Sequence, residues 1–352
     1  MTEERKEPPS PRHNPCLFGH EEALLRVRRA MERERMPHAW LLRGPKGVGK
    51  ATLAWHLARE LLAGPEGWKS CHDPDDPLFR QVASGAHPEL YTLEGEGRAE
   101  RRSDEIPVGE VRALLERLAA TPSRAGYRVV MVEEADRLNR NAANALLKML
   151  EEPPRGVVFL LVARMPAALP ATIVSRCAQL LLRPLAEERV AAALRTLLDL
   201  PAERAAALAS LSGGCIGRGV ELAAGRFLEV YGRVLEGLAT AASPADLLAV
   251  AGELRDAGGD RDGWSGFALL GEVLRRAVRA EAGMPPAVEL VPRERAALAA
   301  VAARHPLDRL AALWDKLQAL ARRGEALHLE ASRALIVFLD ELAAIPEPGG
   351  GR

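Results

Sequence analysis

The sequence has few aromatic residues for its size. Phe, Trp and Tyr make up 4% of its 352 residues, whereas hydrophobic residues as a whole make up 48%. The second half is rich in Ala, Leu, Glu and Arg, a composition that favours helices over β-sandwiches. At roughly 150 residues per domain, the length predicts two to three domains.

An excess of either charge is also absent. Lys and Arg number 48 and Asp and Glu number 48, so the formal net charge is zero. This balance excludes a global basic field for nucleic acid and the global acidity that is typical of disorder. Any charged surface for a partner must therefore be local.

Cysteines and long apolar runs are scarce. Four cysteines lie far apart, namely Cys16, Cys71, Cys177 and Cys215, and no Cys-x-x-Cys pair occurs. This spacing indicates free thiols in a reducing cytosol, and we expect Cys16, Cys177 and Cys215 to be buried. No run approaches the roughly 18 apolar residues of a membrane span, and the N-terminus is polar. We therefore expect a cytoplasmic chain with no membrane partner.

Short apolar runs alternate with helical periodicity up to Pro184. Residues 1–15 combine charge with prolines and predict a flexible tail. The expected strands are 39–42, 90–93, 129–132, 157–163 and 179–182, and the expected helices include 20–35, 108–120 and 141–150. Such alternation predicts a parallel sheet covered by helices on both faces. After Pro184 the pattern is helical to about residue 344, and residues 346–352 form a second tail.

A glycine-rich stretch follows the first strand and precedes an amphipathic helix. It reads Gly44-Pro45-Lys46-Gly47-Val48-Gly49-Lys50-Ala51-Thr52. Backbone amides of such a loop wrap phosphate oxygens, and Lys50 would reach the outer phosphates. The stretch therefore predicts a P-loop, and a chance glycine-rich turn is the alternative.

The P-loop pattern requires a Ser or Thr hydroxyl for magnesium where this sequence has Ala51. Thr52 comes one residue late, and one helical step turns a side chain by about 100°. We therefore expect a vestigial phosphate site, at which ATP or ADP, if bound, is held without hydrolysis.

Two acids, Glu133 and Glu134, end the strand 129–132. A P-loop enzyme places a metal-holding Asp and a water-activating Glu at this point. Glu133 takes the Asp position, but its extra methylene suits octahedral magnesium poorly. Glu134 remains available as a base, and simple capping of the sheet end is the alternative for both.

A third candidate is Arg176, within Ser175-Arg176-Cys177 before the last strand. An arginine on a rigid turn can present its guanidinium to the γ-phosphate of another subunit. Taken alone, a surface salt bridge is the commoner role.

Several motifs together resemble one family. They are residues 17–20 (LFGH), 38–42 (HAWLL), 87–90 (HPEL), 133–154 (EEADRLNRNAANALLKMLEEPP) and 171–177 (ATIVSRC), with the P-loop stretch. In this order they resemble the delta-prime family of subunits of the bacterial DNA polymerase III clamp loader. The resemblance covers about residues 16–225.

This resemblance implies an AAA+ P-loop module over residues 16–184, a helical lid over 185–226 and a helical collar over 227–345. It implies a hetero-pentameric ring with the tau or gamma motor subunits and a delta subunit, which loads the sliding clamp on primed DNA. It also implies that Arg176 is an arginine finger acting in trans, in a subunit without autonomous activity. Polymerase activity would belong to the holoenzyme.

The same resemblance makes some residues informative by position. Arg218 falls where related proteins carry a lid arginine facing nucleotide, and a plain surface role is the alternative. Relatives carry a four-cysteine zinc module after the P-loop helix, but residues 62–85 offer only Cys71 and His72. We therefore expect no zinc and no other metal. The residues after the fourth strand, Val162-Ala163-Arg164, lack a hydroxyl to sense a γ-phosphate.

A second function remains open on the sequence alone. Lys50 and Glu134 would serve a catalytically active AAA+ ATPase, either a motor subunit or another remodelling protein. A P-loop small-molecule kinase is weaker, because no segment resembles an acceptor site.

Overall fold

The computed structural model describes residues 7–93, 105–119, 126–163, 169–241, 243–256, 264–327 and 331–343. The chain divides into two compact units. The first comprises Met1–Ala205 and Leu211–Val220, and the second comprises Ala206–Ser210 and Glu221–Arg352. The sensor residue Arg164, the expected last residues 346–352 and the first six residues lie outside the described part.

A five-stranded parallel sheet forms the centre of the first unit. Its order is β2-β3-β4-β1-β5. The strands are β1 Ala39–Arg43, β2 Leu90–Leu93, β3 Arg128–Val132, β4 Val157–Val162 and β5 Ala178–Leu181. Every residue of β3 and β4 is buried, as expected for strands covered on both faces. All five strands and their parallel arrangement were predicted, so the α/β fold class is confirmed.

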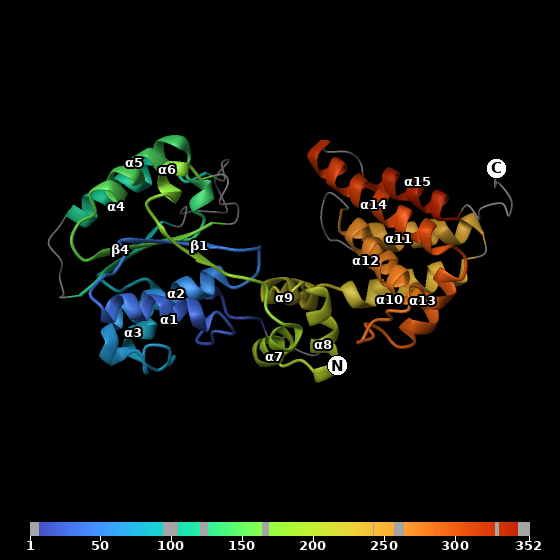
Figure 1. The fold of residues 1–352 in the computed structure, drawn as a ribbon, viewed down its shortest axis with the longest axis horizontal. Coiled ribbons are helices and arrows are strands. Elements are labelled where there is room, and N and C mark those ends of the chain that lie inside the picture. Colours follow the sequence, from blue (N-terminus) through green and yellow to red (C-terminus); the bar gives the residue numbers. More distant parts are fainter. Residues whose placement is uncertain are drawn as a thin grey trace. The chain divides into compact units, whose positions relative to one another are not determined.

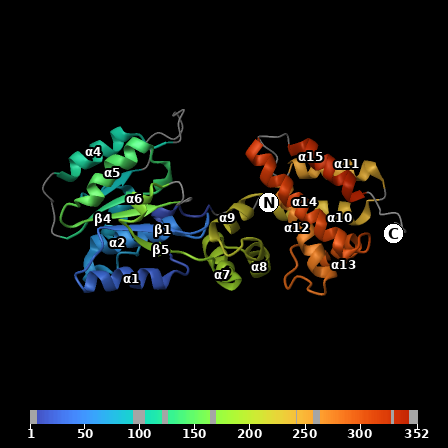
Figure 2. The same cartoon turned by 45° about the horizontal axis from the view of Figure 1, so that its top comes forward.

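Helices cover both faces of this sheet (Figures 1 and 2). One face carries α1 Glu21–Glu32, α2 Lys50–Gly67 and α3 Pro77–Ser84, and the other carries α4 Val108–Ala119, α5 Arg140–Glu151 and α6 Ala171–Val174. Two apolar cores follow from this, one on each side. Because strands alternate their side chains, Trp40 faces one core and Leu41 faces the other.

Helix α2 is buried on every side from Leu53 to Leu61, so its polar residues find partners within the protein. Arg59 is fully buried and donates to the carbonyl oxygens of Arg12 (3.0 Å) and Asn14 (2.9 Å). Burial lowers the pKa of Arg59 to about 10. The segment that holds these two carbonyls contains a short 3-10 helix, Pro11–His13. Part of the expected flexible tail is therefore packed against α2.

The buried carboxylate of Glu60, also on α2, binds two elements that differ from the segment above. Arg28 of α1 donates to both of its oxygens, at 2.5 and 2.9 Å, and His72 lies 3.1 Å away. Burial alone would raise the pKa of Glu60, but His72 and Arg28 outweigh it and lower that pKa. Helix α1 is thus attached to α2 by an ion pair, and the loop after α2 is attached by a hydrogen bond.

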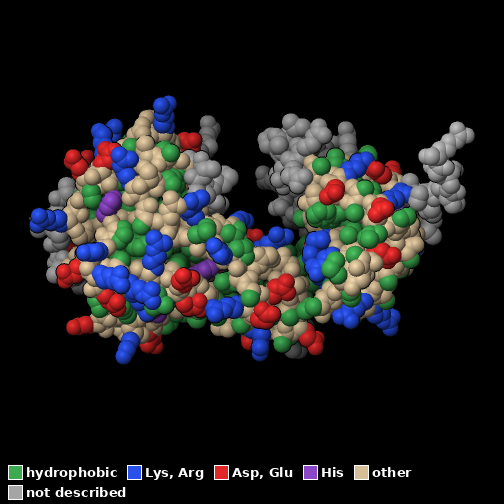
Figure 3. Space-filling model, in the orientation of Figure 1, with side chains coloured by type: hydrophobic (Ala, Val, Ile, Leu, Met, Phe, Trp, Pro, Cys, Tyr) green, Lys and Arg blue, Asp and Glu red, His purple; other side chains and the backbone are tan. Residues whose placement is uncertain are grey.

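The state of the cysteines and the charges on the surface can be compared with what the composition predicts. Cys71, Cys177 and Cys215 are buried free thiols, whereas Cys16, which we expected to be buried, is partly exposed. Both signs of charge occur on each unit on the face drawn in Figure 3, as the balanced composition suggests. Within the described residues, none of the helices has the length and apolar character that crossing a bilayer requires.

Only helices follow β5 in the described part of the chain. The first three are α7 Glu187–Leu198, α8 Ala202–Leu211 and α9 Ile216–Ala224. The remaining six are α10 Phe227–Thr240, α11 Pro244–Asp256, α12 Trp264–Glu281, α13 Glu294–Ala302, α14 Leu307–Leu327 and α15 Ala331–Ala343. The predicted change from alternating strands and helices to helices alone is confirmed.

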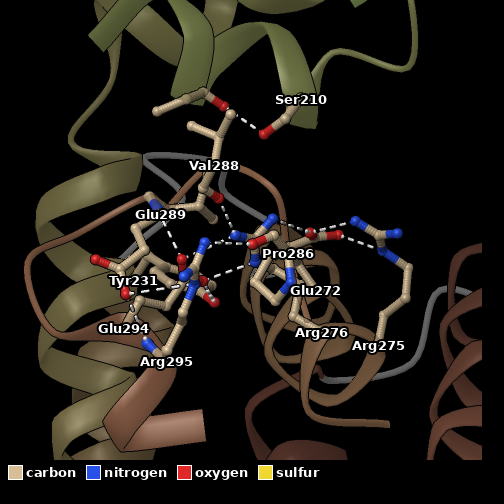
Figure 4. Close-up of polar contacts among 12 residues, drawn as sticks. Ser210, Tyr231, Glu272, Arg275, Arg276, Pro286, Val288, Glu289, Glu294 and Arg295 are labelled. Atoms are coloured by element: carbon tan, nitrogen blue, oxygen red, sulfur yellow. Dashed lines mark hydrogen bonds and ion pairs between the residues drawn. The ribbon is translucent and has the colours of Figure 1, made fainter. Parts of the chain in front are cut away.

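A buried ion pair joins α10, α12 and α13 in the second unit (Figure 4). The carboxylate of Glu294 accepts from Arg276 Nε (2.6 Å) and Nη2 (2.8 Å), from the Tyr231 hydroxyl (2.6 Å) and from the Leu290 amide (2.7 Å). Four donors compensate the desolvation of a charge that is otherwise costly to bury. Burial and the adjacent Glu294 raise the pKa of Tyr231, so its hydroxyl stays a donor.

We predict that His56 makes stability depend on pH. Burial lowers the pKa of His56 to about 3, assisted by the adjacent Arg59, so the unfolded chain binds one more proton between about pH 6.5 and that value. Stability is complete above pH 6.5 and falls toward pH 3, by up to about 1.4 kcal/mol per pH unit. Urea unfolding at several pH values gives the free energy of unfolding against pH. For His56→Gln the slope of this plot between about pH 3 and 6.5 should be smaller by the equivalent of about one proton. His13→Gln, at an exposed histidine, serves as the control. Equal slopes for His56→Gln and the unaltered chain would contradict the prediction.

Candidate functional site

The predicted P-loop lies at the carboxyl end of β1 and leads into α2. Gly44, Gly47 and Gly49 have φ values of 152°, 78° and 108°, which side chains with a Cβ rarely allow. A Cβ on Gly44 would also lie 2.5 Å from the Leu182 carbonyl oxygen. The loop therefore has both the position and the backbone conformation that the motif predicts.

The ammonium group of Lys50 binds the loop itself. Nζ donates to the carbonyl oxygens of Gly44 (2.7 Å) and Pro45 (2.8 Å), and the side chain is buried. In a nucleotide-binding P-loop this lysine reaches the outer phosphates. Here its amine lies on two carbonyl groups of its own loop.

Two further contacts close the loop from outside. The amide of Gly217, at the start of α9, donates to the Gly47 carbonyl oxygen at 2.8 Å. A Cβ on Gly217 would lie 2.8 Å from the Gly47 Cα, so only a glycine fits this approach. From the other side, His20 Nε2 lies 2.8 Å from the Val48 carbonyl oxygen. Burial lowers the pKa of His20, which favours the neutral ring, and its Nε2–H tautomer would donate this bond.

The residue directly after Lys50 lacks the hydroxyl that the P-loop motif requires. Ala51 and Thr52 lie in the first turn of α2, and both are partly buried. Ala51 stands at the position that follows the lysine and has no hydroxyl. The loop therefore lacks at this position the magnesium ligand that the motif normally supplies.

Glu133 is hydrogen-bonded to a tryptophan of the P-loop helix. The indole Nε1–H of Trp55 donates to Glu133 Oε1 at 2.8 Å. Trp55 is fully buried and the Arg12 guanidinium lies 4.8 Å from its ring centroid. One oxygen of the carboxylate at the metal-holding position is thus bound by a neutral donor, which disfavours its use as a magnesium ligand.

Glu134, the predicted base, is buried beside a cation. Its Oε2 lies 2.5 Å from Arg137 Nη1. One oxygen of the predicted base is therefore engaged by an arginine of its own chain. The position was predicted from the sequence, but the ion pair was not.

Arg176 lies on the turn between α6 and β5. Its flanking residues Ile173 and Cys177 are buried in the core, and burial raises the pKa of Cys177 to about 12. The side chain is 36% exposed, and its guanidinium donates to Glu151 Oε1 (2.7 Å) and to the Thr172 carbonyl oxygen (3.0 Å). A turn anchored by two buried residues therefore presents a charged group at the surface.

Arg218 follows the glycine that contacts the P-loop. A Cβ on Gly47 would lie 2.9 Å from its backbone nitrogen, whereas its side chain is exposed. The backbone of Arg218 thus lies beside the phosphate loop, and a role for its guanidinium stays a prediction.

Three residues of this site were not found from the sequence, namely His20, Trp55 and Gly217. His20 belongs to the LFGH motif and Gly217 to a glycine cluster, but neither pattern indicates a contact with the P-loop. Trp55 lies in the apolar period of α2 and reads as a core residue. Across the described ranges, no group of three or more His, Cys, Asp or Glu side chains is placed to hold a metal ion.

Known proteins resemble this chain over part of its length. A family model described as DNA polymerase III, delta subunit, matches residues 19–186. The DNA polymerase III subunit delta' of Pseudomonas aeruginosa is 41% identical over 184 residues, which cover 52% of this chain and 54% of that protein. The subunit delta' of Yersinia pestis is 34% identical over 246 residues, which cover 66% of this chain and 69% of that protein. The chain belongs to the DNA polymerase III delta-prime family.

Similarity also extends to another subunit type. DNA polymerase III subunit tau of Escherichia coli is 33% identical over 189 residues, which cover 52% of this chain and 27% of that protein. The chain spans about half the length of the Pseudomonas relative and a smaller share of the tau subunit. The similarity of this chain thus includes a tau subunit as well as delta' subunits.

We predict that Gly217→Ala weakens the contact between α9 and the P-loop. The added methyl group would overlap the Gly47 Cα, and we expect a loss of about 1–3 kcal/mol in the free energy of unfolding. Hydrogen exchange at the Gly217 amide should become faster. Urea unfolding measures the free energy, and mass spectrometry of exchanged peptides measures the exchange.

Gly109→Ala is the matched control, because Gly109 is likewise the second residue of its helix and has open space around its Cβ position. It should leave stability unchanged or raise it by up to about 1 kcal/mol. Equal stability of the two variants would show that the close approach of Gly217 to Gly47 is absent.

Proposed function

We propose that this chain is the delta-prime subunit of a DNA polymerase III clamp loader and that it supplies Arg176 to a neighbouring subunit without hydrolysing ATP. The observation that carries the second part is the hydrogen bond from Trp55 to Glu133. It binds the carboxylate that a motor subunit would turn toward magnesium. Family membership supports the first part.

Neither of the two protein groups that normally hold magnesium in a P-loop enzyme is available in this chain. P-loop enzymes hold the ion with a hydroxyl after the lysine and with an acid at the end of a neighbouring strand. Ala51 has no hydroxyl, and Glu133 accepts from Trp55. The residues present do not fit a magnesium nucleotide, so no hydrolysis step is assigned to this chain.

The phosphate loop itself is engaged by its own protein. Lys50 binds two loop carbonyls and Gly217 binds a third. A nucleotide that used Lys50 would have to draw its amine away from these two carbonyl groups. The geometry supports a subunit whose form does not depend on bound ATP or ADP.

Arg176 fits a role outside its own P-loop. Its turn is anchored by buried residues, while its guanidinium keeps three of its five N–H groups beyond the two hydrogen bonds it makes. A planar cation of this kind stabilises the charge that develops on a transferred phosphoryl group. The γ-phosphate would belong to a tau or gamma motor subunit.

The proposal includes a set of partners in the cytoplasm. The chain would join motor subunits and a delta subunit in a hetero-pentameric ring, with the helices after α9 as its collar. Primed DNA and the sliding clamp would be met through the assembled complex. A catalytic ATPase of the same fold is the alternative, and the retained Lys50 and Glu134 are the observations that favour it.

We predict that Arg176→Ala slows ATP hydrolysis by the assembled complex. Arginine fingers contribute roughly 10³ to 10⁵ in rate at the site they complete, so hydrolysis at the one affected site should nearly cease. Steady-state phosphate release is measured with motor subunits, delta subunit, clamp and primed DNA. The purified chain alone should release no phosphate above background.

Arg189→Ala is the control, because Arg189 is an exposed arginine in another ion pair of the first unit. It should leave the rate unchanged. An unchanged rate for Arg176→Ala would overturn the proposed role of that residue. Turnover by the isolated chain that is lost in Lys50→Ala would establish the ATPase alternative.

A further prediction concerns the missing hydroxyl. Ala51→Thr alone should leave the purified chain inactive, because Trp55 still binds Glu133 and Gly217 still lies on the P-loop. Phosphate release with Mg-ATP measures this, and Thr52→Ala tests whether the existing hydroxyl contributes. Activity gained by Ala51→Thr would show that a single residue separates this chain from a motor subunit.

A further inference from the structure

The guanidinium of Arg176 is held at both of its terminal nitrogens. Nη1 donates to the Thr172 carbonyl oxygen at 3.0 Å, within the same turn. Nη2 donates to Glu151 Oε1 at 2.7 Å, on a different element. Because the two acceptors lie on different elements, the plane of the guanidinium is fixed relative to α5 and not only to its own turn.

Glu151 stands where its own helix disfavours it. It is the last residue of α5, and the carboxyl end of a helix carries a partial negative charge. A cation is the favoured residue at such an end, as Lys148 illustrates one turn earlier. The negative charge of Glu151 does not stabilise α5, because it adds to the partial negative charge of the helix end. We therefore explain Glu151 by its ion pair with Arg176.

We propose that Glu151 is a positioning residue that holds Arg176 in the orientation required at the neighbouring subunit's γ-phosphate. This inference rests on the proposed function of Arg176. The hydrogen bond to Thr172 restrains one end of the guanidinium, and the bond to Glu151 restrains the other. Three N–H groups stay available for phosphate oxygens, so the ion pair persists while the arginine acts.

The expected effect follows from the exposure of the pair. Arg176 and Glu151 are 36% and 44% exposed, and ion pairs at such sites hold an orientation only modestly. Loss of Glu151 should therefore lower the population of the correct orientation and reduce the rate of hydrolysis about two- to five-fold. The effect is much smaller than that of removing Arg176 itself.

The experiment compares variants of this chain in the complex with motor subunits, delta subunit, clamp and primed DNA. Glu151→Ala should lower kcat two- to five-fold at the one site that Arg176 completes and leave KM for ATP unchanged, since the motor subunit binds the nucleotide with its own loop. Glu151→Gln keeps an oxygen that accepts from Nη2 and should retain most of kcat. Glu152→Ala is the matched control, because Glu152 is the next residue, is exposed and carries the same charge. It should equal the unaltered chain.

A double variant shows whether Glu151 acts through Arg176. Arg176→Ala and Arg176→Ala with Glu151→Ala should have the same rate, because the partner of Glu151 is already absent. Urea unfolding of Glu151→Ala verifies that the chain is folded.

The outcomes separate this inference from the function on which it rests. A slow Arg176→Ala with a normal or faster Glu151→Ala overturns the positioning role and leaves the proposed function standing. An equal loss in Glu151→Ala and Glu152→Ala assigns the effect to the charge of the helix end and also overturns it. An unchanged rate for Arg176→Ala overturns both proposals.

Discussion

The burial of helix α2 on every side is the constraint on which the first unit depends. No residue from Leu53 to Leu61 is more than 3% exposed, yet this stretch includes Trp55, His56, Arg59 and Glu60. A polar group without a partner in such a place costs free energy of folding, so the surrounding elements must supply one. An ordinary amphipathic helix would turn these residues toward water and make no such demand on its surroundings.

The partners of α2 come from far apart in the sequence and determine what surrounds the site. Arg59 is satisfied by carbonyl groups near the N-terminus, and Glu60 by Arg28 and His72. Trp55 is satisfied by Glu133 at the end of β3. The hydrogen bond that disfavours magnesium is therefore the same bond that allows a tryptophan to be buried in the helix. Structure and the proposed lack of hydrolysis have one physical cause.

The sheet was predictable because its signal is local. Buried parallel strands are continuous apolar runs, and β4, Val157–Val162, has no polar residue at all. The P-loop was equally evident, since its three glycines, Gly44, Gly47 and Gly49, lie within one stretch of six residues. The packing of Arg12 and Asn14 was not predictable. The composition of residues 1–15 predicts a flexible tail, and composition cannot indicate that two carbonyl groups of this segment bind Arg59. The contact of Gly47 with Gly217 was hidden for the same reason, as two glycines carry no indication that they meet.

The proposed role has two parts, namely that Arg176 acts at a neighbouring subunit and that this chain does not hydrolyse ATP. Both parts require a first unit that keeps one conformation. An arginine that completes a neighbour's site must stay fixed relative to its own sheet, and Ile173, Cys177 and the ion pair with Glu151 fix it there. A P-loop that opened and closed with nucleotide would move α9 against that sheet. Here the Gly217–Gly47 hydrogen bond holds α9 on the loop. The proposed lack of hydrolysis and the proposed role of Arg176 therefore support each other, because a frame that did not respond to ATP would keep the guanidinium in one place.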